Sequence, residues 1–139
     1  GFTMVKFIIG KKGSGKTNKL IDMVNEAVKT DKGHIVFINN SARHMFSLNY
    51  KVRLIDTQNF KIDSYETLYG LICGILSQDY DVSNIFVDSI TRIVDDVDLK
   101  HGEAVIEELD KLLEESNVNL VVTASVDVDA APEFIKKYL

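Results

Sequence analysis

Eight residues near the start of the chain have the types and spacing needed to hold a phosphate group. They are Gly10-Lys11-Lys12-Gly13-Ser14-Gly15-Lys16-Thr17. This stretch matches the pattern G-x-x-x-x-G-K-[ST], in which glycines let the loop turn its backbone N–H groups toward a phosphate. Lys16 is placed to reach the β- and γ-phosphates, and the Thr17 hydroxyl to ligate Mg²⁺. The loop therefore predicts a site for a nucleoside triphosphate.

The segments on either side of this loop fit the same interpretation. The apolar run 4–9 precedes it and predicts a short buried strand, and helical spacing begins near Lys16. Apolar residues recur at that spacing up to a stop near Gly33. A helix that starts at the loop adds the positive end of its dipole to the phosphate site. The predicted cofactor-binding residues are Gly10, Lys11, Lys12, Gly13, Ser14, Gly15, Lys16, Thr17 and Asn18.

A second segment supplies the acid that such a site needs for its metal. The apolar residues 85–87 predict a buried strand, and Asp88 follows them about 70 residues after the loop. We expect Asp88 to hold Mg²⁺, usually through water, and to face Thr17 from the neighbouring strand. The sequence thus predicts Thr17 and Asp88 as the metal-binding residues and Lys16 and Asp88 as the catalytic ones, with ATP and Mg²⁺ as cofactors.

The rest of the chain alternates strands and helices in a pattern typical of a parallel sheet. Further strands are predicted at 35–38, 52–55 and 118–123, and helices from about Ser64, from about Gly102 and over 133–139. Strands that are apolar on both faces belong in a sheet covered on both sides. We therefore expect a three-layer α/β/α sandwich with a mostly parallel five-stranded sheet and the ligand at the carboxyl ends of its strands.

Length, charge and composition limit the classes of function that fit this chain. The chain has 139 residues and a net charge of −5, which fits one domain over 4–139, with 1–3 expected to be a cloning remnant. Ten acidic residues lie between Asp88 and Glu115, against three basic ones, so nucleic acid is not an expected partner. The single Cys73 is expected in the core. No apolar run reaches the roughly 18 residues of a membrane span, and no signal peptide is evident, so we expect a cytoplasmic protein.

Together, the loop at 10–17 and the segment Ile85-Phe86-Val87-Asp88-Ser89-Ile90-Thr91 resemble the RecA/KaiC-like branch of the P-loop ATPases. The resemblance implies a RecA-like fold and ATP as the ligand. That family places a catalytic glutamate after the second strand, where this chain has Asn39 and Asn40. Unless Glu66 or an aspartate from a neighbouring loop substitutes, we expect slow hydrolysis.

In proteins of that family, a polar residue at the end of the last strand also contacts the γ-phosphate. Thr123 and Ser125 match that position in this chain. The loops by which RecA-like recombinases bind DNA correspond here to 94–102 and 126–131, which are short and acidic. The family's DNA function is therefore not carried over.

Other readings remain open. An arginine finger would have to be Arg43, Arg53 or Arg92, and Arg92 is the best placed of them, while a solvated or ion-paired arginine is the simpler interpretation. Lys11 stands where ParA/MinD-like ATPases carry a lysine that reaches across an ATP-bridged dimer, although a surface lysine is the simpler interpretation. The motifs by which GTPases read guanine are missing, and a kinase ranks third because no arginine follows Arg92.

Two hypotheses result for the function. The chain is either a minimal RecA-like ATPase, which could act as a ring or dimer in which a neighbouring subunit completes the site, or an ATP-responsive switch that barely hydrolyses and acts through a protein partner. The segment 43–50, with large apolar residues among polar ones, is the candidate surface for such a partner.

Overall fold

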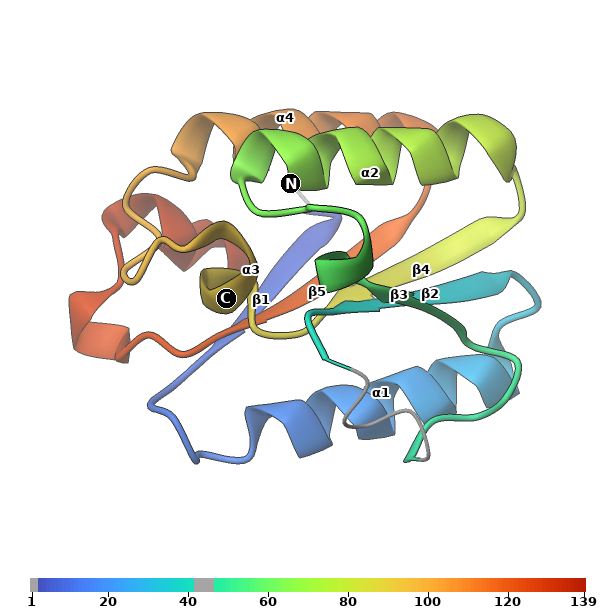
Figure 1. The fold of residues 1–139 in the computed structure, drawn as a ribbon, viewed down its shortest axis with the longest axis horizontal. Coiled ribbons are helices and arrows are strands. Elements are labelled where there is room, and N and C mark those ends of the chain that lie inside the picture. Colours follow the sequence, from blue (N-terminus) through green and yellow to red (C-terminus); the bar gives the residue numbers. More distant parts are fainter. Residues whose placement is uncertain (1–2, 42–46) are drawn as a thin grey trace.

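The computed structural model describes residues 3–41 and 47–139, and its strands form a five-stranded sheet. Neighbouring strands all run parallel, in the order β1-β5-β4-β2-β3 (Figure 1). The strands are β1 (Val5–Ile9), β2 (His34–Asn39), β3 (Arg53–Asp56), β4 (Val82–Val87) and β5 (Asn119–Ala124). The parallel sheet predicted from the sequence is confirmed.

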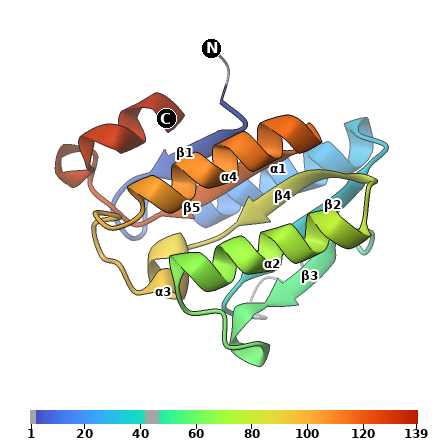
Figure 2. The same cartoon turned by 90° about the horizontal axis from the view of Figure 1, so that it is seen from above.

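Helices cover both faces of this sheet. Helix α1 lies on one face, and α2 and α4 lie side by side on the other (Figures 1 and 2). The α-helices are α1 (Lys16–Thr30), α2 (Tyr65–Gln78), α3 (Ile90–Val94) and α4 (Glu103–Ser116), and the 3-10 helices are η2 (Thr57–Asn59), η3 (Val128–Ala130) and η4 (Glu133–Tyr138). The short α3, which directly follows the β4 end, was not expected from the sequence.

The side chains of β2 show why the sheet needs cover on both sides. Ile35 and Phe37 pack into the cluster beneath α1, while Val36 and Ile38 pack into the larger cluster beneath α2 and α4. All four are at most 3% exposed. A strand that is apolar on both faces is stable only between two layers of helices, which is the arrangement of parallel sheets.

Helix α2 begins where the sequence predicted. Ser64 is the N-cap, its side chain accepts a hydrogen bond from the Thr67 N–H, and Thr67 bonds back to complete a capping box. The buried stripe of this helix includes Leu68, Ile72 and Ile75. Cys73 was expected in the core, but it is only half-buried, because it lies beside that stripe rather than on it. That expectation was wrong.

The order of the strands differs from the order expected for the two halves of the site. Asp88, at the end of β4, was expected on the strand next to the one that carries the loop. The structure places β5 between β1 and β4, so the two strands are not neighbours. Pairing in register still aligns their carboxyl ends, because β5 pairs Ile8 with Thr123 on one side and Val122 with Val87 on the other.

Two further expectations concern surfaces. Half of the candidate partner segment 43–50, residues 43–46, lies outside the described residues; in its other half, Tyr50 is 89% exposed. Among the helices that the structure describes, none has the length and apolar character needed to cross a bilayer.

Candidate functional site

The glycine-rich loop joins the end of β1 to the start of α1. Gly13 and Gly15 have φ of 84° and 83°, in the left-handed region that favours glycine. A Cβ atom on Gly10 would lie 2.8 Å from the Ser14 Oγ, so the loop also needs a small residue there. Helix α1 has neither a side-chain cap nor an acidic residue in its first turn. Its positive end and its first N–H groups therefore remain open to an anion.

In this structure the Lys16 side chain folds back onto its own loop. Its ammonium donates to the Lys11 carbonyl oxygen at 2.8 Å and to the Ser14 Oγ at 3.3 Å. Partial burial lowers the pKa of Lys16, and the negative charge of Asp88 opposes that shift. The lysine is thus held by weak, exposed partners, which a stronger acceptor such as a phosphate could replace.

Thr17 and Asp88 are in contact in the structure, although β5 lies between β1 and β4, the strands that precede them. The Thr17 hydroxyl lies 3.2 Å from each carboxylate oxygen of Asp88. Asp88 is 3% exposed, and its backbone N–H donates to the Ile38 carbonyl oxygen at 2.9 Å. Because an ionised carboxylate only accepts hydrogen bonds, the Thr17 proton points at Asp88 and its oxygen lone pairs point elsewhere. A hydroxyl and a carboxylate oxygen are hard donors of the kind that Mg²⁺ binds.

A cavity of about 550 Å³ opens over this pair of residues. The residues that line it come from the loop, from α1 and α3, and from the carboxyl ends of β2, β4 and β5. They are Lys12, Gly13, Gly15, Lys16, Thr17, Asn18, Asn39, Ser41, Asp88, Ser89, Thr91, Arg92 and Ser125. Seven of these residues (Lys12, Gly13, Gly15, Lys16, Thr17, Asn18 and Asp88) belong to the site predicted from the sequence.

The remaining loop residues of the predicted site, Gly10, Lys11 and Ser14, do not line the cavity. The Ser14 N–H donates to the Lys11 carbonyl oxygen at 3.2 Å, which closes the turn. The Lys11 ammonium lies 3.5 Å from the Asp127 carboxylate, in an exposed ion pair. Asp127 also accepts a hydrogen bond from the Asp129 N–H, and these two contacts lower the pKa of Asp127. No pattern in the sequence indicated this ion pair, because it joins two loops far apart along the chain.

A second carboxylate does not reach the cavity from the part of the chain that the structure describes. Asn39, at the position where the resembling family has its glutamate, is 5% exposed and lines the cavity. Its Oδ1 accepts the Asn40 N–H at 2.8 Å. Glu66, named as a substitute, lies exposed in the first turn of α2 and does not line the cavity. Of the described residues, Asp88 is therefore the one acid available there.

Arg92 is the arginine that the structure brings to the cavity wall. It lies on α3, whose start is set by Ser89 in the left-handed conformation (φ 61°), and its backbone N–H donates to the Ser89 carbonyl oxygen. Arg53 pairs instead with Asp79. Arg43, the third candidate, lies outside the described residues.

Thr123 and Ser125, matched to one position of the resembling family, have different places in the structure. Ser125 lines the cavity. Thr123 is 1% exposed and donates to the Asp88 Oδ1 at 2.7 Å, beneath the cavity floor. The two residues therefore cannot both read a phosphate, and Thr123 contacts the acid instead.

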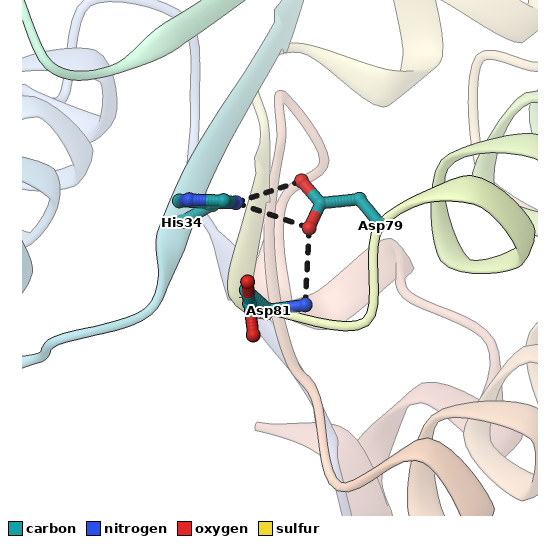
Figure 3. A group of neighbouring side chains, drawn as sticks. All are labelled: His34, Asp79 and Asp81. Atoms are coloured by element: carbon teal, nitrogen blue, oxygen red, sulfur yellow. Dashed lines mark hydrogen bonds and ion pairs between the residues drawn. The ribbon is translucent and has the colours of Figure 1, made fainter.

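A separate polar cluster occupies the opposite end of the sheet. His34 begins β2, and its Nδ1 lies 2.8 Å from the Asp79 Oδ2, with Asp81 beside it (Figure 3). Asp79 also accepts from the Asp81 N–H and from Arg53. The hydrogen bond with His34 is the main cause that lowers the pKa of Asp79. With its oxygens already bonded to cationic and N–H partners, this carboxylate has no need of a metal ion.

The chain was compared with protein families and with curated proteins. No protein-family model matches the chain, and no curated protein matches it at a significant level.

Proposed function

We propose that the chain binds ATP with Mg²⁺ in the cavity over Thr17 and Asp88 and hydrolyses it slowly. The observation that carries the proposal is the 3.2 Å contact between the Thr17 hydroxyl and Asp88, two residues far apart in sequence that meet at the mouth of a glycine-rich loop. The loop and motif resemblance to RecA/KaiC-like ATPases supports the same ligand.

In this proposal the phosphates lie against the loop and the first turn of α1. Backbone N–H groups of Gly13 and of residues 15–17, together with the positive end of α1, hold the phosphate oxygens, while the Ser14 N–H stays bonded to the Lys11 carbonyl. Lys16 releases its own loop and bonds to the outer phosphates, and Arg92 on α3 can add a further positive charge. Thr17 and Asp88 would hold Mg²⁺, which would neutralise charge on the phosphates. ATP is preferred over GTP because the sequence lacks the guanine-reading motif.

We expect slow hydrolysis because the cavity has an amide where the resembling family has a carboxylate. A carboxylate can accept the proton of an attacking water, whereas an amide can only position that water. Asn39 lines the cavity at the place of the family's glutamate. We therefore favour a protein whose bound state lasts long enough to act on a partner. Lys11 gives no specific support for an ATP-bridged dimer, since its ammonium pairs with Asp127 of the same chain.

Calorimetry of the purified chain tests the binding. We expect saturable heat with ATP in the presence of Mg²⁺ and weaker binding when EDTA removes the metal. Asp88→Asn should still bind ATP but lose most of the response to Mg²⁺. Glu115→Gln, an equal change of charge at the far end of α4, is the matched control and should behave as the parent. If the parent shows no saturation at millimolar ATP or GTP with Mg²⁺, the proposal is wrong.

Steady-state phosphate release tests the second half of the proposal. We expect turnover well below about 1 s⁻¹, the lower end of typical enzyme rates. Turnover above that rate, with binding intact, would identify an ordinary ATPase and remove the case for a slow switch.

A further inference from the structure

The buried hydroxyl of Thr123 joins the two residues that follow strand β4. It accepts a hydrogen bond from the Ser89 N–H at 2.8 Å and donates to the Asp88 Oδ1 at 2.7 Å. A hydroxyl carries one proton, and a backbone N–H can only donate to it. The proton of Thr123 therefore has one available direction, toward the carboxylate. With Thr123 1% exposed, water does not compete for either bond.

The strand register explains why Thr123 is the residue in this position. Val122 of β5 pairs with Val87 of β4, so the next residue along β5 is level with Asp88. On its other edge β5 pairs with β1, the strand that leads into the loop. Thr123 thus lies on the strand between β1 and β4, level with Asp88 and bonded to it.

We propose that Thr123 is a positioning residue that orients the Asp88 carboxylate for Mg²⁺, an inference that rests on the proposed function. Thr123 donates its short bond to Oδ1, whereas the Thr17 hydroxyl lies 3.2 Å from both oxygens. Oδ2 is therefore the oxygen that a metal ion, or a water bound to it, would meet beside Thr17. The same hydroxyl holds the Ser89 N–H where the backbone turns left-handed into α3, the helix that carries Arg92 to the cavity. Thr123 thereby acts through Asp88 and Ser89 and does not touch the phosphate itself.

Two substitutions separate this role from simple packing. Thr123→Val keeps the shape of the side chain and removes the hydroxyl, whereas Thr123→Ser keeps the hydroxyl. We expect the valine variant to need at least tenfold more Mg²⁺ for half-maximal ATP binding, which corresponds to about 1.4 kcal/mol. Its affinity for ATP in EDTA should stay within about threefold of the parent, and the serine variant should recover most of the Mg²⁺ response.

A second measurement needs no nucleotide. Amide hydrogen exchange at Ser89 should be at least tenfold faster in Thr123→Val than in the parent or in Thr123→Ser, because the acceptor of that N–H is lost. If the valine variant does not fold, Thr123→Ala removes the same hydroxyl and is judged by the same two measurements.

A double-mutant cycle tests whether Thr123 acts through the acid. Added to Asp88→Asn, Thr123→Val should change the Mg²⁺ response little further. The inference is overturned if the parent binds MgATP but the valine variant responds to Mg²⁺ as the parent does, or if the serine variant loses as much as the valine variant. It is also overturned if affinity falls equally with Mg²⁺ and with EDTA. Absence of MgATP binding by the parent itself would instead overturn the proposed function, and this inference with it.

Discussion

Replacement of Lys16 by alanine should remove most of the affinity for MgATP while leaving the fold intact. In the structure the Lys16 ammonium makes two hydrogen bonds, to the Lys11 carbonyl and to the Ser14 hydroxyl. Both bonds are exposed and lie within the loop, so their loss should change the free energy of unfolding by no more than about 0.5 kcal/mol. The effect of the substitution should therefore appear in binding.

The size of that effect follows from the bonds exchanged on binding. Two charge-assisted hydrogen bonds to phosphate oxygens contribute about 1.5–3 kcal/mol each, and the two exposed loop bonds given up are together worth no more than about 0.5 kcal/mol. The net contribution of Lys16 is then about 2.5–5.5 kcal/mol, which corresponds to a loss of affinity of roughly 70- to 10,000-fold.

Competition with a fluorescent ATP analogue at constant Mg²⁺ measures this loss, and a thermal melt of the same samples checks the fold. Lys32→Ala is the matched control, since it removes the same charge from the exposed turn between α1 and β2. An affinity of Lys16→Ala within threefold of the parent, with the control unchanged, would refute the assignment of Lys16 to the phosphates.

The remaining predictions concern stability. Because the pKa of Asp79 is lowered from 3.8 in the folded chain, its ionised pairs stabilise the fold above about pH 4 and lose that effect as the pH falls through the folded pKa. The urea midpoints of the parent and of Asp79→Asn should therefore converge between pH 5 and pH 2.5, and a constant gap would contradict the role of the His34–Asp79 pair. In the core, Leu113→Ala should reduce the free energy of unfolding by about 2–5 kcal/mol, because this side chain is 0% exposed. The half-buried neighbour Leu112→Ala should reduce it clearly less, and equal losses in urea denaturation would show that the buried face of α4 is misassigned.

Local patterns in the sequence predicted the five strands and the three long helices, and they indicated where the two halves of the candidate site lie. The apolar residues of β2 and β4 indicated strands buried on both faces, and Ser64 marked the start of α2. The glycine spacing placed the loop, and Asp88 directly after an apolar run placed the acid. These features depend on neighbours along the chain, which is why they could be read without a structure.

The features that the sequence did not reveal depend on which strands lie side by side. Nothing local to β5 indicates that it lies between β1 and β4, so the contact of Thr123 with Asp88 could not be foreseen. The ion pair of Lys11 with Asp127 could not be predicted for the same reason, since it depends on which segments lie side by side. Helix α3 was missed because Ser89, a residue other than glycine, adopts a positive φ, which sequence patterns rarely indicate.

The position of β5 has a consequence for how this molecule could respond to a ligand. Hydrogen-bonded strands lie about 4.8 Å apart, so the two strands that flank β5 stand roughly 9–10 Å from each other. That separation is fixed by backbone pairing along the whole length of the sheet and cannot widen or narrow by small steps. Any motion that accompanies ligand binding must therefore come from rotating side chains and from the connections above the strand ends, while the sheet itself stays rigid.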